Sequence, residues 1–345
     1  SRGAYTVSVT CDKDSSGFWD YNNWGAVVTN INTGTSCEID FTSGKYLSDY
    51  IIDASKTDKQ IKQITEPETE QTGANATEEY RYVGESAKVN NWVYFGCDSD
   101  CTEDNLYRII GVIPTQSIIG GTYEKRVKLI KASYYTETTS GLLRSGTYAP
   151  SSGGYAWNNI NSNAWENSPL QKTVLNNVYW GSLGEYQKYI DPTVWYTGAS
   201  KYSGLQTNTN SDFYKTERST LKGLSGGNLL LNAYIGLMYP SDYSYAMDEF
   251  YWSDAVMSTG STSYKYNWMY SLQNKYYEWT ITPESSGNDG KGIVGIWWIN
   301  PDGYVSYVFA PSTVSGVRPT FNLKTNVMYK SGTGTSSDPY RIIIN

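Results

Sequence analysis

Four cysteines are the residues of this sequence best suited to covalent chemistry. Cys97 and Cys101 enclose only Asp-Ser-Asp, whereas Cys11 and Cys37 lie at the ends of two candidate strands. An even number of cysteines with these spacings favours two disulfides, and disulfides persist in oxidising compartments. A zinc site would need two close pairs of thiolates, and only one pair is close. We therefore expect two disulfides and an extracellular or cell-surface location, with free thiols and zinc as the alternatives.

The chain contains no histidine. This absence excludes catalytic triads that use histidine and metal sites with histidine ligands. A glycosidase would instead need two carboxylates that face each other across a cleft. The sequence offers candidates for such a pair but does not show that any two converge: Asp242, Asp248, Glu249, Asp254 and Glu278. Acidic residues in tyrosine-rich loops more often bond hydroxyl groups, so we expect no enzyme, and a carbohydrate-active enzyme is the less favoured alternative.

Two acidic turns carry oxygen ligands of the kind that calcium prefers. The first is Asp12-Lys-Asp14, and the second is Asp98-Ser-Asp100 followed by Glu103 and Asp104. The first lacks a glutamate at the twelfth loop position, where Asn23 stands. Asp and Ser favour such turns without any ion, because their side chains bond nearby backbone groups. We therefore expect no metal and no cofactor, and calcium stays open as an alternative.

Aromatic residues are abundant, with 33 tyrosines, 12 tryptophans and 7 phenylalanines. Between residues 239 and 309 they alternate with Ser, Asn, Asp and Gly, a composition that resembles an antibody paratope. The alternative is that the rings fill the core of a chain poor in Leu and Ile. We expect Trp279, Trp297 and Phe321 to be internal. The residues expected at a ligand-binding surface are Tyr243, Tyr245, Tyr251, Tyr276, Trp298, Asn300, Asp302 and Tyr304.

The elements that must position these residues divide the chain into three parts. Residues 1–45 predict a small β module with strands at 5–10, 24–30 and 37–41. Residues 46–79 predict a helix that ends near Ile64, then an acidic, solvated linker. In residues 80–345, Ser168 and Pro169 form a helix-start signal for a helix over 169–180, and 213–221 predicts another. Short strands are expected at 80–83, 92–96, 106–112, 127–133, 292–299, 304–309, 320–323 and 340–344. The fold class is therefore α+β, with many short strands and long loops.

Charge argues against a nucleic-acid partner, and hydropathy argues against a bilayer-spanning helix. The chain has 27 basic and 34 acidic residues, a net charge of −7. No stretch is basic enough to follow a phosphate backbone, so we expect no nucleic-acid partner. The longest apolar runs are too short for a bilayer-spanning helix.

Six separated motifs, in order, resemble a group of extracellular surface proteins from Gram-positive gut bacteria. They are Tyr80-Arg-Tyr-Val-Gly-Glu85, Asn91-Trp-Val-Tyr-Phe-Gly-Cys97, Asp104-Asn-Leu-Tyr-Arg-Ile-Ile-Gly-Val112, Ile235-Gly-Leu-Met-Tyr-Pro-Ser-Asp-Tyr243, Tyr277-Glu-Trp-Thr-Ile281 and Gly316-Val-Arg-Pro319. The last motif, with the tryptophans before it, is similar to the C-terminal half of C-type-lectin-like folds of the formylglycine-generating-enzyme kind. That resemblance implies a lectin-like domain over 80–345 and a structural Arg318 that bonds carbonyls or a carboxylate. The oxidase chemistry of that kind is not implied, because no cysteine follows Cys101.

The resemblance implies a non-catalytic binding or adhesion protein, pilus-like or displayed at the cell surface. Its expected partner is a glycan or a protein on another cell or host surface. Lectin-like domains of this kind also serve as variable proteins of diversity-generating retroelements, and the stretch before Gly316 has a compatible composition. The alternative is a structural subunit that self-associates into a surface filament.

Overall fold

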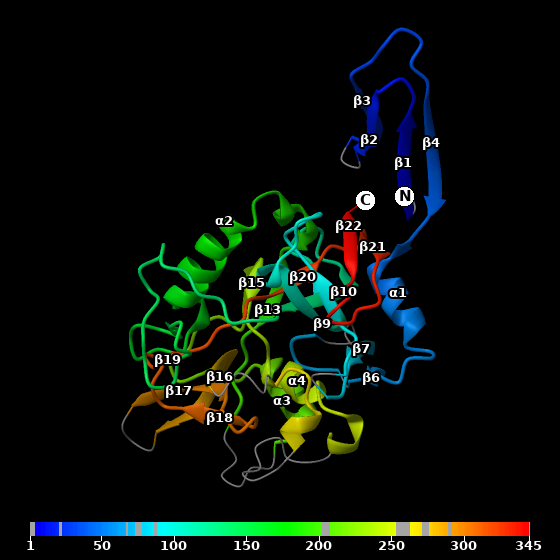
Figure 1. Ribbon diagram of the computed structural model, residues 1–345. Coiled ribbons are helices and arrows are strands. Elements are labelled where there is room, and N and C mark those ends of the chain that lie inside the picture. Colours follow the sequence, from blue (N-terminus) through cyan, green and yellow to red (C-terminus); the bar gives the residue numbers. More distant parts are fainter. Residues whose placement is uncertain are drawn as a thin grey trace.

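The computed structural model describes residues 4–20, 23–66, 68–72, 78–85, 88–201, 208–252, 263–270, 276–288 and 292–344. Strands predominate over helices, and both occur in the same body, so the chain is α+β as expected. Figure 1 shows a rounded body from which the first four strands project. The domain boundaries expected after residues 45 and 79 stay predictions.

The projecting strands form two hairpin-like pairs. Strand β1 (Tyr5–Cys11) pairs antiparallel with β4 (Cys37–Ser43), and β2 (Ser16–Asp20) pairs with β3 (Gly25–Thr29). Cys11 and Cys37 are directly opposite in the β1–β4 register and form a disulfide. The second disulfide joins Cys97 to Cys101. Both expected disulfides are therefore confirmed.

The segment after the projecting strands differs from its prediction. Strand β5 (Lys45–Tyr46) leads into helix α1 (Leu47–Ala54), but the helix ends there. Ile61 and Ile64 lie instead on strand β6 (Ile61–Thr65). The prediction of one helix to Ile64 was wrong, because two short buried elements with a turn between them produce the same spacing of apolar residues as a broken helical stripe.

The acidic segment that follows was expected to be solvated, and its described ends are buried. Glu66 is 2% exposed and accepts a hydrogen bond from the Tyr245 hydroxyl. Glu79 is fully buried and pairs with Arg81 at 2.6 Å. Residues 67 and 73–77 of this segment lie outside the described residues. The solvated-linker prediction was wrong at both ends, because buried partners compensate these carboxylates: hydroxyl groups bond Glu66, and the Arg81 guanidinium pairs with Glu79.

The body is built on an eight-stranded sheet. Its main path runs β12-β20-β10-β9-β7-β6, with β8 paired to β9 and β15 paired to β20. The two long central strands are β9 (Leu106–Gln116) and β10 (Tyr123–Lys131). The others are β7 (Glu78–Tyr82), β8 (Trp92–Tyr94), β12 (Ile190–Asp191), β15 (Ile235–Gly236) and β20 (Thr320–Leu323).

Helices and smaller sheets surround this sheet (Figure 1). The helix predicted after Ser168 is present as a π-helix, η3 (Leu170–Tyr179), continued by α2 (Trp180–Ser182) and a 3₁₀ turn, η4 (Gly184–Tyr189). The Ser168 hydroxyl accepts a hydrogen bond from the amide of Gln171 at 3.3 Å, as its predicted capping role requires. Two further α-helices of the described residues are α3 (Asn210–Glu217) and α4 (Pro240–Tyr245). Short 3₁₀ turns are η1 (Glu103–Asn105), η2 (Trp165–Asn167), η5 (Glu249–Tyr251) and η6 (Ser263–Tyr266).

The C-terminal part adds a three-stranded sheet of β16 (Glu278–Asn288), β17 (Ile293–Ile299) and β18 (Val305–Val308). A second three-stranded sheet joins β22 (Arg341–Ile344) and β21 (Val327–Ser331) to β5. Two further pairings are short: β11 (Tyr155–Ala156) with β19 (Val314–Ser315), and β13 (Thr193–Tyr196) with β14 (Leu230–Ala233). Trp279, Trp297 and Phe321 are fully buried, as predicted.

Candidate functional site

Half of the residues expected at a ligand-binding surface are buried. Tyr243 and Tyr245 lie on α4, all of whose residues are buried, and Trp298 and Asn300 are each 5% exposed. The Tyr243 hydroxyl donates a hydrogen bond to the Gly303 carbonyl at 2.7 Å. The Tyr245 hydroxyl donates to the Glu66 carboxylate. These four surface predictions were wrong, because the three aromatic side chains supply core volume and the Asn300 side chain bonds the backbone amides of Asp302 and Tyr304.

The remaining four do not form one site. Tyr304 and Asp302 lie near Tyr277, whose pKa is raised by burial, by Tyr148, and by these two residues. The Tyr277 ring lies 3.9 Å from the ring of Trp298. Tyr276 borders a recess of only about 10 Å³, which Tyr243 and Asn300 also line. Elsewhere, Tyr251 stacks on Tyr266, with ring centres 4.8 Å apart.

The described candidate catalytic carboxylates each bond partners of their own. Asp242 accepts hydrogen bonds from Lys128 at 2.5 Å and Arg81 at 2.9 Å, and all three are buried. Glu278 pairs with Arg318 at 2.6 Å. Asp248 caps a short helical turn, Glu249 pairs with Lys62 at the surface, and Asp254 lies outside the described residues. Burial alone would raise the pKa of Asp242, but Lys128 and Arg81 hold it well below its usual range.

The two acidic turns considered for calcium do not gather ligands. Among the described residues, no three His, Cys, Asp or Glu side chains are placed to hold a metal ion. Asp12 instead accepts a hydrogen bond from the amide of Ser36 at 2.8 Å, a turn contact.

A pocket of about 550 Å³ opens where the start of β9 lies beside the end of β10. Its walls come from four separate parts of the chain: the loop after β8, the β9–β10 pair, the segment after β10, and the helical stretch from η3 to η4. Six aromatic rings line it: Phe95, Tyr107, Tyr134, Tyr135, Tyr179 and Tyr186. Polar side chains lie between them: Asp104, Asn105, Lys131, Thr136, Ser182 and Glu185.

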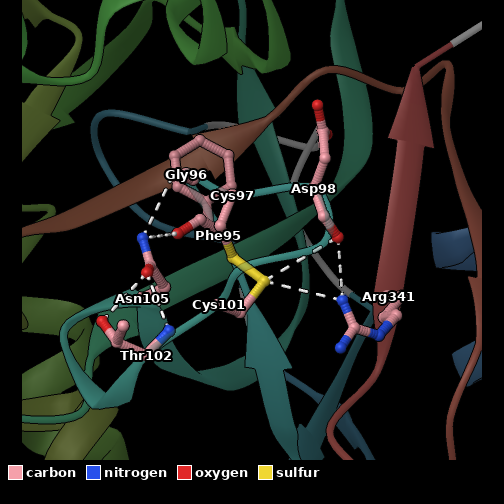
Figure 2. The surroundings of a disulfide bond; sticks show 8 residues. All are labelled: Phe95, Gly96, Cys97, Asp98, Cys101, Thr102, Asn105 and Arg341. Carbon is pink, nitrogen blue, oxygen red and sulfur yellow. Dashed lines mark hydrogen bonds between the residues drawn. A yellow bond between two sulfur atoms is a disulfide. The ribbon is translucent and has the colours of Figure 1, made fainter.

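The Cys97–Cys101 disulfide holds one wall of this pocket, and Figure 2 shows its surroundings. The side-chain amide of Asn105 donates to the carbonyls of Gly96 at 3.1 Å and Phe95 at 3.4 Å. From the opposite side, Arg341 donates to the carbonyl of Asp98 at 2.9 Å. The loop is therefore tied at both ends before any ligand arrives, which lowers the entropy lost on binding.

Lys131 and a tyrosine pair lie at the base of the pocket. The Lys131 ammonium donates to the carbonyl of Asp104 at 2.5 Å and lies 5.3 Å from the centre of the Tyr107 ring. Burial lowers the pKa of Lys131, and the Asp104 carboxylate partly offsets this effect. The hydroxyls of Tyr107 and Tyr179 are 2.6 Å apart. The base thus offers a cation and hydroxyls beside apolar ring faces.

The helical wall carries accessible groups of the pocket. Tyr179 ends the π-helix η3, and π-helical stretches often occur at functional sites. Beyond it, Glu185 is exposed and Tyr186 is half-buried. Burial, Asp98 and Glu185 together raise the pKa of Tyr186 to about 12, so its hydroxyl stays protonated and can donate or accept at neutral pH.

No family model, curated protein or solved structure matches this chain. The chemistry of the pocket is therefore inferred from the side chains of this chain alone. Among the described residues, no helix has the length and apolar character needed to cross a bilayer.

The sequence prediction placed the site between residues 239 and 309 and missed this pocket. The pocket residues are distant in sequence and include no dense run of rings. Two sequence signals were nevertheless present: the close Cys97–Cys101 pair, which restrains a wall, and the adjacent Tyr134-Tyr135 pair directly after a predicted strand. Residues that follow a strand often reach a binding surface, because loops lie at the ends of the scaffold.

Proposed function

We propose that this chain is a non-catalytic extracellular binding protein, and that the pocket between the Cys97–Cys101 loop and the η3–η4 wall takes one or two saccharide units of a glycan. The single observation that carries the proposal is the lining of the pocket, which combines six aromatic side chains with amide, hydroxyl, carboxylate and ammonium groups. Sugars present apolar C–H faces and a rim of hydroxyls, so they need both kinds of contact.

The size of the pocket favours a small ligand over a protein surface. A volume of about 550 Å³ falls within the range of small-molecule pockets, whereas protein partners generally meet broad, flatter surfaces. The two disulfides are consistent with an oxidising, extracellular setting. We propose further that the protein acts as an adhesin and that its body has a lectin-like fold. The lectin-like resemblance is supported by Arg318, which bonds a carboxylate and the Met269 carbonyl, as that resemblance implied.

The test is a glycan array followed by titration of each hit, monitored by intrinsic fluorescence. Tyr186→Ala should weaken binding at least tenfold, because it removes a half-buried ring from the pocket wall. Tyr304→Ala is the matched control, since it removes an equally half-buried tyrosine near Tyr277, outside the pocket. The reverse pattern would move the site to the Tyr277 cluster, and the absence of any glycan hit would refute the saccharide assignment.

A further inference from the structure

The four projecting strands have no core of their own. Among the described residues from 4 to 43, only Ser15 is buried. Large apolar side chains remain open to solvent, with exposed fractions of 57% for Phe18, 51% for Phe41, 40% for Ile39 and 39% for Tyr5. A cluster of this kind on a small unit marks an interaction surface more often than a free surface.

The β1–β4 pair has one apolar face, and only part of it is covered. The register places Val7 opposite Phe41 and Val9 opposite Ile39, so these four side chains share a face. Strand β2 covers the β1 part of this face: a Cβ atom added to Gly17 would lie 2.4 Å from Val9. Figure 1 shows β2 and β3 on the β1 side of the pair and β4 at the outer edge. Trp19 on β2 also contacts Phe41, with ring centres 5.2 Å apart, yet Phe41 and Ile39 on β4 stay 51% and 40% exposed.

The edge of β4 is also open. Within the described part of the chain, β4 pairs with β1 alone, and six of its seven residues are exposed. The backbone N–H and C=O groups on its outer edge can therefore pair with a further strand. Addition of a strand to such an edge is a common mode of peptide recognition, in which main-chain bonds supply affinity and alternate side chains supply specificity.

The charges on β4 indicate which strand fits. Glu38 and Asp40 lie on the face opposite Ile39 and form no ion pair with any described residue. If two copies paired their β4 strands over the full length, Asp40 of one copy would lie opposite Asp40 of the other. A shift of the register by two residues toward Cys37 would instead place Glu38 opposite Asp40, whereas a shift toward Ser43 would place Asp40 opposite Thr42 and leave only residues 39–43 paired. Like charges directly opposite destabilise strand pairs, so these residues oppose self-pairing and favour a basic partner strand.

We propose that the open edge of β4, with Ile39 and Phe41 beside it, accepts an extended segment of another protein in which apolar residues alternate with lysine or arginine. The apolar residues of the segment would cover Ile39 and Phe41, and its basic residues would lie against Glu38 and Asp40. The projecting strands would then attach this protein to a second protein, separately from ligand binding in the pocket.

The test uses the full chain and a fluorescein-labelled seven-residue peptide that alternates valine with lysine. Its matched control is the same peptide with glutamate in place of each lysine. Fluorescence anisotropy should show saturable binding of the lysine peptide at least tenfold tighter than binding of the glutamate peptide. Asp40→Lys changes an exposed side chain and should reverse or abolish this preference, with circular dichroism as the folding control. Hydrogen exchange at the amides of β4 should slow when the lysine peptide binds.

Three results would overturn the proposal. The first is no saturable binding of the lysine peptide up to about 1 mM, the weak limit of specific recognition. The second is equal affinity for both peptides in the parent chain. The third is concentration-dependent self-association in sedimentation that Asp40→Lys strengthens and the lysine peptide does not compete with, which would assign the β4 edge to a second copy of this chain.

Discussion

Arg318 donates hydrogen bonds from Nε and from one Nη atom to the two carboxylate oxygens of Glu278, at 2.6 and 2.9 Å, and both side chains are buried. The same Nη atom donates to the carbonyl of Met269 at 2.9 Å. Arg318 thus joins the first residue of β16 to the segment before β20. A planar, two-pronged cation suits this position better than lysine would.

Arg318→Met should lower the free energy of unfolding by about 3–5 kcal/mol, because it leaves the Glu278 carboxylate buried without its cation. Burial already raises the pKa of Glu278, so the carboxyl group of the variant can become protonated in acid. The loss should therefore be smaller near pH 5 than near pH 8. Urea unfolding at the two pH values measures it. The double variant with Glu278→Gln should recover most of the stability, and a double variant no more stable than the single one would contradict this account.

Glu217 should make the chain less stable as the pH rises toward neutrality. Burial raises its pKa to about 7 from an ordinary 4.5, although Arg218 and the hydrogen bonds from Ser241 act in the opposite direction. The folded state then holds a proton that the unfolded state releases. The stabilising contribution is complete below about pH 4.5 and is lost as the pH rises to about 7, a loss of about 3 kcal/mol. Urea unfolding across this range should show the slope, and Glu217→Gln should remove it; an unchanged slope in that variant would assign the effect to another group.

Removal of the Cys11–Cys37 disulfide should affect the projecting strands and little else. Those strands have no buried apolar core, so the cross-link that joins β1 to β4 supplies about 3 kcal/mol that packing does not. Cys11→Ser combined with Cys37→Ser should make the amides of β1 and β4 exchange rapidly with solvent, while the thermal midpoint of the body stays unchanged. A matching fall in that midpoint would show that the strands and the body unfold together.

Removal of the Cys97–Cys101 disulfide should weaken ligand binding more than it weakens the fold. This bond closes a very short loop, which restrains the unfolded chain little, yet it fixes one wall of the pocket. Cys97→Ser with Cys101→Ser should reduce affinity for a glycan hit several-fold with little change in thermal stability. The paired Cys11 and Cys37 variant is the control and should bind as the parent chain does. Equal binding by both variants would show that the wall is positioned without its disulfide.

Gly111 should not tolerate a methyl group. It lies on β9, where an added Cβ would approach the carbonyl oxygen of Tyr80 to 2.2 Å, so the strands would have to separate. Gly111→Ala should cost about 1–3 kcal/mol by this overpacking. Gly181 on α2 has no atom within 4 Å of such a Cβ, so Gly181→Ala should be neutral or stabilising by up to about 1 kcal/mol. Chemical denaturation of both variants tests the contrast, which equal effects would contradict.

The sequence predicted secondary structure well where a local pattern is compatible with one kind of element. Alternating residues located β1, short strand-like runs located most of β9 and β10, and the serine–proline pair before Leu170 located the start of η3. It did not predict secondary structure where one pattern is compatible with both a helix and a strand. Ile61 and Ile64 fit a helical stripe and a short strand equally well.

Tyrosine explains why the site was harder to predict than the fold. Its ring can fill a core, as in Tyr243, or line a pocket, as in Tyr186, and its neighbours in sequence do not distinguish the two. The burial of acidic residues was equally hard to predict. Glu66, for example, is buried against Tyr245, which lies in a distant segment of the chain. The pocket joins four such segments, and that convergence is a property of the sheet topology.

The narrow junction between the projecting strands and the body also has a mechanical consequence. A pull on β4 would pass through Gly44 into β5, whose only described strand pairing is Tyr46 with Met328 and Lys45 with Tyr329. Two residue pairs resist less force than the long β9–β10 pairing, so these two pairs would separate before the eight-stranded sheet opened. The junction would thus extend under shear while the eight-stranded sheet stays folded. The pocket, which lies at that sheet, would keep its shape and its ligand.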